Sequence, residues 1–182
     1  MTSQGSKVHL NDALVRAKDF LEVLKPFVTK AEIAGSIHRK VKMVGDIEIV
    51  CMESPFNSIE NLIHSEYPGL GVNGPRLKRI IQEGVQIDLF IAQPHDYGRI
   101  FAIRTGSAAF AHHKLAKRWR DLGWCGTNLG LRKVADCVRK SNRWEVRKEL
   151  NGEEDKPPVF ETEYDFFNFL NIPWIPPEER NI

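Results

Sequence analysis

The chain contains stretches whose hydrophobic residues recur at helical spacing and stretches in which apolar and polar residues alternate. The helical pattern predicts helices at residues 10–29, 57–66 and 107–122. Alternation and short apolar runs predict strands at residues 31–35, 46–52, 76–82 and 85–92. Glu83 and Gly84 separate the last two strands, which indicates a hairpin.

Capping and turn residues add boundaries to these elements. Asn11 or Asp12 is a suitable N-cap for the first helix, and Gly123 ends the third. Residues 68–75 (PGLGVNGP) predict a turn-rich loop. This loop lacks the Lys-Ser/Thr ending of a P-loop, so we assign it no phosphate-binding role.

The last third of the chain has a weaker pattern. It predicts short strands at residues 128–133 and 143–150 and a linker at residues 152–158. Thr162 begins a further helix, with Asp165 at the capping-box position. The segment after that helix is too rich in proline to be helical, and we expect it to pack Trp174 and Ile175 as a tail.

The composition excludes several classes of protein. No apolar run approaches the ~18 residues needed to span a bilayer, and the segment MTSQGSKVHLND has no apolar signal-peptide region. We therefore expect a protein that is not secreted and has no membrane partner. It should act in the cytoplasm, either as a bacterial protein or as a viral or phage protein in the cytosol of the host. Cys51, Cys125 and Cys137 match neither a disulfide framework nor a zinc pattern, and we expect buried or half-buried thiols in a reducing compartment.

The net charge of +2 conceals an asymmetry along the chain. Residues 104–148 contain 12 lysines and arginines against 3 acidic residues, a local charge of +9. Residues 149–182 contain 2 against 9, a local charge of −7. The basic block has tryptophans interleaved with its cations, which suits a polyanionic partner. A solvated helix face balanced by the acidic tail is an equally good interpretation.

Two carboxylates lie one residue apart in a strand that is otherwise apolar. Side chains at i and i+2 of a strand point the same way, about 6–7 Å apart. Asp46 and Glu48 should therefore project from one face while Ile47 and Ile49 fill the other. Asp88 repeats the pattern in the hairpin. If the two strands are neighbours, three carboxylates converge; the alternative is a sheet edge with ordinary exposed acids.

Converging carboxylates and a Gly-Ser turn together indicate phosphoryl chemistry. Three close carboxylates repel each other, and a divalent ion relieves that repulsion. Oxygen-only ligands favour Mg²⁺ or Mn²⁺, and two ions about 4 Å apart would hold the attacking and leaving oxygens. Gly35 and Ser36 would hold a phosphate, and Arg39 would neutralise a triphosphate. These features indicate attack of a hydroxyl on the α-phosphorus of a nucleotide, with pyrophosphate as the leaving group.

The order of these motifs resembles a known family. Gly-Ser at 35–36, Gly-Asp-x-Glu at 45–48 and the strand acid Asp88 resemble the palm of the X-family DNA polymerases, the DNA polymerase beta-like nucleotidyltransferases. Thr-Gly-Ser at 105–107 lies 17 residues after Asp88 and resembles the motif that this family places at the sugar and base of the nucleotide.

The resemblance implies a fold and a set of site residues. The fold is α+β: a nucleotidyltransferase palm, a mixed sheet flanked by helices, in residues 1–104, and a small thumb-like α/β subdomain in residues 105–182. Asp46, Glu48 and Asp88 would be both the catalytic residues and the ligands of two Mg²⁺ (or Mn²⁺) ions. The implied nucleotide-binding residues are Gly35, Ser36, Arg39, Gly45, Thr105, Gly106 and Ser107.

Several positions depart from the family's pattern. Glu48 stands where the second acid is usually Asp, and Ile103 and Arg104 replace two residues that are usually aromatic. Ala111 stands where an Asn would hydrogen-bond the base. The short segment before the palm has no room for the family's lyase and fingers regions, which implies a minimal palm-plus-thumb form, similar to the smallest viral members. DNA would then be bound by the basic helix, through Lys114, Lys117, Arg118 and Arg120.

The predicted function is nucleotidyl transfer to a DNA 3′ end, with gap filling or repair as candidate roles. The expected partners of this monomer are DNA with a 3′ hydroxyl and a nucleoside triphosphate. One alternative is a nucleotidyltransferase with another acceptor, such as RNA, a protein or a small molecule. The other is a catalytically silent module that binds nucleic-acid ends, in which Glu48 marks the loss of activity.

Overall fold

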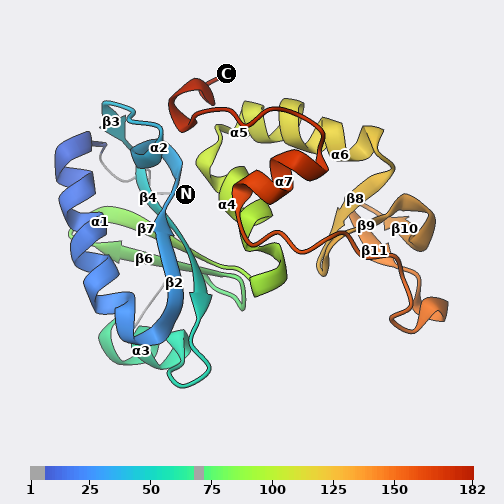
Figure 1. Cartoon of the computed structure of the whole chain (residues 1–182). Coiled ribbons are helices and arrows are strands. Elements are labelled where there is room, and N and C mark those ends of the chain that lie inside the picture. Colours follow the sequence, from blue (N-terminus) through green and yellow to red (C-terminus); the bar gives the residue numbers. More distant parts are fainter. Residues whose placement is uncertain (1–6, 68–71) are drawn as a thin grey trace.

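The larger sheet of the molecule is five-stranded and mixed, in the order β2-β4-β7-β6-β5. The computed structural model describes residues 7–67 and 72–182 (Figure 1). The strands are β2 (Val28–Ile33), β4 (Asp46–Glu53), β5 (Val72–Asn73), β6 (Leu77–Gln82) and β7 (Val85–Ile91). Strands β4 and β7 run parallel, and the other neighbours are antiparallel. Part of the predicted loop 68–75 lies outside the described residues.

The predicted hairpin is confirmed as β6 and β7. Gln82 pairs with Val85 across the turn, and Glu83 and Gly84 have φ values of 48° and 75°. Positive φ at both turn residues matches the right-handed twist of the two strands. This short turn fixes which residues of β6 and β7 lie opposite each other.

Two helices cover one face of the sheet. Helix α1 (Leu10–Leu24) and α3 (Ile59–Glu66) pack there against the buried residues of β4, including Ile47 and Ile49. A small two-stranded sheet, β1 (Val8–His9) with β3 (Met43–Val44), lies beside them.

The first predicted helix is shorter than expected. It ends at Leu24 and not at residue 29, because Pro26 lacks an N–H donor and the chain continues through a 3₁₀ turn into β2. The N-cap prediction is also wrong. His9 is the N-cap, and its Nδ1 accepts a hydrogen bond from the Asn11 backbone N–H.

The opposite face of the sheet carries Asp46, Glu48 and Asp88, and we call it the acidic face. Helix α4 (Tyr97–Thr105) covers part of it, where Tyr97 and Phe101 pack against other residues of β4 and β7. The short helix α2 (Gly35–His38) follows β2 and contacts both β4 and α4. The acids therefore lie next to α2 and α4.

The predicted basic helix is confirmed, with a π-helical middle. It comprises α5 (Ala108–Phe110), a π-helical segment (Ala111–Ala116) and α6 (Lys117–Asp121). Ser107 is its N-cap, and the chain leaves the helix at Gly123, which has a φ of 80°. Only a residue without a Cβ adopts that φ readily.

A four-stranded sheet follows, in the order β10-β11-β8-β9. Its strands are β8 (Trp124–Thr127), β9 (Gly130–Lys133), β10 (Cys137–Lys140) and β11 (Arg143–Val146). The sequence pattern predicted β9 and β11 but not β8 or β10. The predicted strand 143–150 ends early, because residues 148–150 form a 3₁₀ turn and Asn151 is left-handed.

Helix α7 (Glu163–Phe169) returns to pack on α4. Its predicted capping box between Thr162 and Asp165 is present. The proline-rich tail has no α-helix, and Trp174 and Ile175 pack on the core of this part as predicted. All three cysteines are buried and free, as predicted. Across the two described ranges, the helices are too short or too polar to cross a membrane.

Candidate active site

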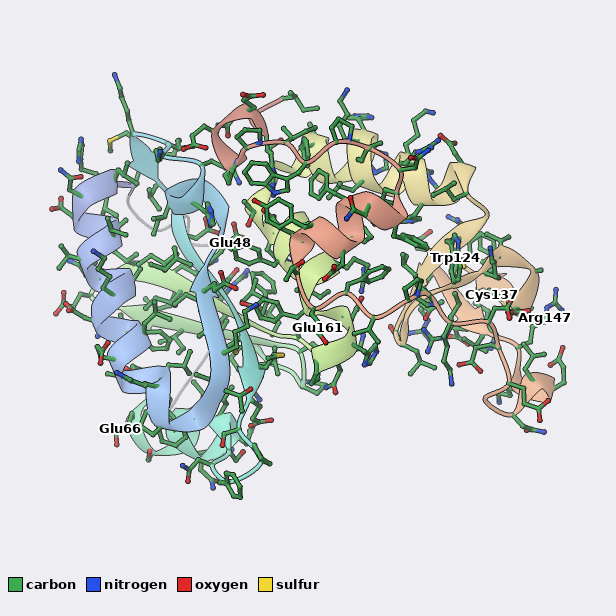
Figure 2. The ribbon with its side chains drawn as sticks, in the orientation of Figure 1. Glu48, Glu66, Trp124, Cys137, Arg147 and Glu161 are labelled. Carbon is green, nitrogen blue, oxygen red and sulfur yellow. The ribbon has the colours of Figure 1, made fainter. Side chains whose placement is uncertain are left out.

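The three predicted acids meet on the acidic face because β4 and β7 are parallel neighbours. Glu48 pairs with Asp88 in register, and Asp46 pairs with Gln86. Ile47 is fully buried on the other face, as the alternation predicted. Figure 2 places Glu48 near one end of β4, on the side that faces α4.

Arg79 on β6 lies directly opposite Asp88 and binds it with both ends of its guanidinium. Arg79 Nε donates to Asp88 Oδ1 at 2.7 Å, and Nη2 donates to Oδ2 at 2.7 Å. Gln86 Nε2 donates to the same Oδ2 at 3.3 Å. Within the described ranges, no three acidic, imidazole or thiol side chains have the geometry to hold a metal ion. At this site both oxygens of the Asp88 carboxylate are bound by Arg79.

Burial and mutual repulsion act on the other two acids. Burial raises the pKa of Asp46, and the charge of Asp88 raises it further. Burial, together with the charge of Asp46, raises the pKa of Glu48 to about 7, against the opposing effects of Arg104 and Arg39. A nearby cation stabilises the charged form of a carboxyl group whose pKa is raised by burial and repulsion. Carboxylate oxygens are the donors that Mg²⁺ or Mn²⁺ prefers, but in the described ranges they are not arranged as a metal site, and Arg79 binds both oxygens of Asp88.

Two further arginines of the site, Arg79 and Arg104, were not predicted as site residues. Arg79 could have been found, because a hairpin that pairs Gln82 with Val85 also pairs Arg79 with Asp88. Arg104 lies at the end of α4 with its guanidinium 3.8 Å from the centre of the Phe90 ring. No sequence pattern places Arg104 near the acids, because its position depends on how α4 crosses the sheet.

Gly35 and Ser36 lie against Glu48. Gly35 has a φ of 62°, and a Cβ there would lie 2.1 Å from Glu48 Oε2, so only glycine fits. The Ser36 hydroxyl is buried without a hydrogen-bond partner. Gly45 has open space around it, so packing does not explain that glycine.

Residues 105–107 link α4 to the basic helix. Thr105 is fully buried, and its carbonyl accepts a hydrogen bond from Arg39 Nη1 at 2.8 Å. A Cβ on Gly106 would lie 2.5 Å from the Phe110 ring, and the Ser107 hydroxyl accepts from the Phe110 N–H at 3.0 Å. The structure thus brings Arg39 and residues 105–107 together.

A few buried polar atoms of the described residues lack a hydrogen-bond partner. In the described part of the chain, the buried side-chain atoms without a partner are Ser36 Oγ, Arg104 Nε and Thr105 Oγ1. Buried polar groups in proteins are nearly always hydrogen-bonded, so such atoms call for an explanation. Two of the three belong to predicted nucleotide-binding residues.

The four predicted DNA-binding residues are not equivalent. Lys114, Lys117 and Arg120 are exposed, although Lys117 pairs with Asp121 at 3.0 Å. Arg118 is half-buried, and its Nε donates to the Leu170 carbonyl at 2.8 Å. Arg118 therefore has a structural role inside the protein.

Comparison with known proteins gives the same architecture. Residues 101–181 match the family model described as DNA polymerase beta thumb. The crystal structure of Leishmania infantum polymerase beta in a ternary P/T complex has a TM-score of 0.70 and 17% identity, covering 98% of this chain and 78% of that chain. The ternary gap complex from the same organism has a TM-score of 0.67 and 17% identity, covering 97% and 71%. No curated protein matches the chain in sequence.

The fold is therefore that of a polymerase beta-like protein in a small palm-and-thumb form. The predicted α+β class is confirmed by the two sheets and their helices. The predicted resemblance to the X-family DNA polymerases is confirmed by the fold and by the thumb match over residues 101–181. We call the five-stranded sheet with its helices the palm and the segment matched by the family model the thumb.

Proposed function

We propose that the protein transfers nucleotides to a DNA 3′ end, with Asp46, Glu48 and Asp88 as ligands of two Mg²⁺ or Mn²⁺ ions. The observation that carries this proposal is the in-register pairing of Glu48 with Asp88 on the face beside α2 and α4. Bound divalent ions supply charge neutralisation to the transferring phosphoryl group. Asp88 would face the primer 3′ hydroxyl and help to activate it.

The remaining site residues would bind the nucleotide. Ser36 and Arg39 would hold the β- and γ-phosphates, and residues 105–107 would contact the sugar and base. Three observations support these roles: the unpartnered hydroxyl of Ser36, the unpartnered hydroxyl of Thr105, and the hydrogen bond from Arg39 to the Thr105 carbonyl. Gly35 allows the phosphate-binding turn to approach Glu48. Gly45 belongs to this set by its motif alone.

The proposal includes a DNA path and a division of the chain. The exposed cations of the basic helix would bind backbone phosphates of the DNA. The proposed palm comprises residues 1–104 and the proposed thumb residues 105–182, a boundary that falls within α4. A monomer that fills gaps during repair remains the proposed biological form.

A second candidate is a silent module that binds DNA ends. The observation in its favour is the Arg79–Asp88 ion pair, which occupies both oxygens of one predicted metal ligand. Primer extension on gapped, blunt and single-stranded DNA, with dNTPs or NTPs and with Mg²⁺ or Mn²⁺, separates the candidates. Incorporation contradicts the silent module, and the preferred acceptor tests the role of DNA.

The Asp88→Asn variant tests the site itself. We expect incorporation to fall by roughly 10³-fold, because several kcal/mol of transition-state stabilisation is lost with a metal ligand. Asp46→Asn provides a second site variant in case the loss of the Arg79 pair harms folding, and the exposed Asp19→Asn is the matched control. Wild-type extension rates in both site variants would contradict the proposed site.

A further inference from the structure

Arg39 is held by two neutral oxygen atoms from distant parts of the chain. Its Nε donates to Asn181 Oδ1 at 2.7 Å, and its Nη1 donates to the Thr105 carbonyl at 2.8 Å. Neither acceptor carries a charge. The guanidinium is thus oriented without being neutralised, unlike Arg79, which binds a carboxylate.

Arg39 also lies close to the acids of the site. The charges of Glu48 and Asp46 act on its guanidinium and oppose the effect of burial, which lowers the Arg39 pKa. A guanidinium has five N–H donors, and the two hydrogen bonds described above use two of them. Within residues 7–67 and 72–182 the other three have no hydrogen-bond partner, so they can bind a ligand with several anionic oxygens.

Asn181 is itself firmly placed by the residues beside it. Arg180 is fully buried and binds both carboxylate oxygens of Glu163, at 2.8 and 3.0 Å. The Arg180 carbonyl accepts a hydrogen bond from the Ser107 N–H at 3.0 Å. Asn181 therefore presents its amide oxygen to Arg39 from a segment anchored in the thumb.

We propose that Asn181 is a positioning residue, which orients Arg39 for the triphosphate of the nucleotide. This inference rests on the proposed function and extends it. Both acceptors of Arg39 belong to the thumb side of the molecule, whereas Arg39 follows α2 of the palm. Nucleotide affinity therefore depends on the tail of the thumb being docked against the palm.

Nucleotide binding to the Asn181→Ala variant tests the proposal. Titration calorimetry with dATP and Mg²⁺ should show about tenfold weaker binding, because Arg39 loses the acceptor that fixes its direction. Binding of deoxyadenosine, which has no phosphate, should not change. The exposed Asn168→Ala variant on α7 is the matched control and should bind dATP as the wild type does.

A double-mutant cycle separates positioning from general support of the fold. In the Arg39→Ala background, Asn181→Ala should have no further effect on dATP affinity, since Asn181 acts only through Arg39. An equal loss in both backgrounds would overturn the inference, as would tighter binding by Asn181→Ala alone. If Arg39→Ala itself leaves dATP affinity unchanged, the proposed phosphate-binding role of Arg39 fails, and the inference fails with it.

Asn181→Asp tests whether the neutrality of the acceptor matters. The substituted side chain retains an oxygen that can orient Arg39, but its negative charge compensates the guanidinium and repels a triphosphate. We expect dATP affinity to fall at least as far as in Asn181→Ala. Wild-type affinity in Asn181→Asp would overturn the claim that Arg39 must keep its full charge.

Discussion

Glu48 has a carboxyl group whose surroundings disfavour its negative charge. Burial, followed by the charge of Asp46, raises its pKa from 4.5 to about 7. In the unfolded chain the group returns to the lower value. Between these two pH values the folded protein therefore binds more protons than the unfolded one, so stability decreases as the pH rises.

Without divalent ions, the free energy of unfolding should fall between about pH 4.5 and 7, by up to roughly 3 kcal/mol from this group, and then level off. Glu48→Gln removes this titration, so the variant should exceed the wild type in stability at pH 8 and match it below about pH 4, where the carboxyl group is protonated in both states. Urea unfolding of both proteins in EDTA measures the difference. Equal stabilities at pH 8 would contradict the raised pKa.

The acids of the site were predictable at the level of single residues. A side-chain period of two places Asp46 and Glu48 on one face, and the same period in the next strand places Asp88 there too. Among the nearby positive charges, the one that the pattern does not predict is Arg104. Arg104 reaches the acids only because α4 folds back across the sheet, which is a property of tertiary packing.

The elements were predictable where their local chemistry is strong. The two-residue turn between β6 and β7 made the hairpin predictable, and the capping box made the start of α7 predictable. All four strands of the smaller sheet have four residues each, too few to establish a period, so the pattern predicted this sheet only in part. The π-helical segment within the basic helix was not predictable either, because its sequence is compatible with an ordinary α-helix.

The basic helix offers a test of the DNA path. Lys117 pairs with Asp121, so Lys114 and Arg120 are the better residues to replace. Changing both to Ala should weaken DNA binding evenly across sequences and flatten the log–log salt dependence by about 2, because two phosphate contacts are lost. Fluorescence anisotropy of labelled DNA over a range of salt concentrations measures the slope.

Arg118→Ala is the control on the same helix. Its hydrogen bond to the Leu170 carbonyl lies within the protein, so this change should lower the free energy of unfolding by about 1–2 kcal/mol. Its effect on the salt slope should be smaller than that of the double variant. An unchanged slope in Lys114→Ala/Arg120→Ala would place the DNA path on another surface.

At the scale of the whole molecule, α4 joins the palm to the thumb. On one side, the Tyr97 hydroxyl donates to Glu32 Oε1 at 2.9 Å. On the other, Gly98 lies against the start of α7, and its N–H donates to the Phe160 carbonyl at 2.7 Å. Figure 1 shows α4 between the larger sheet and α7. The relative position of acids and thumb therefore depends on close packing at Gly98.

Gly98→Ala should loosen this junction. A Cβ there would lie 1.9 Å from the Thr162 carbonyl oxygen and 2.2 Å from its carbon, so the backbone of α7 must move. Overpacking of this kind costs about 1–3 kcal/mol of stability. Incorporation should fall as well, since Arg39 takes one of its acceptors from Thr105 at the end of the same helix. Gly126→Ala, at an open position of β8, is the matched control for urea unfolding and primer extension. If Gly98→Ala matches this control in both measurements, α4 does not couple the two parts as we argue.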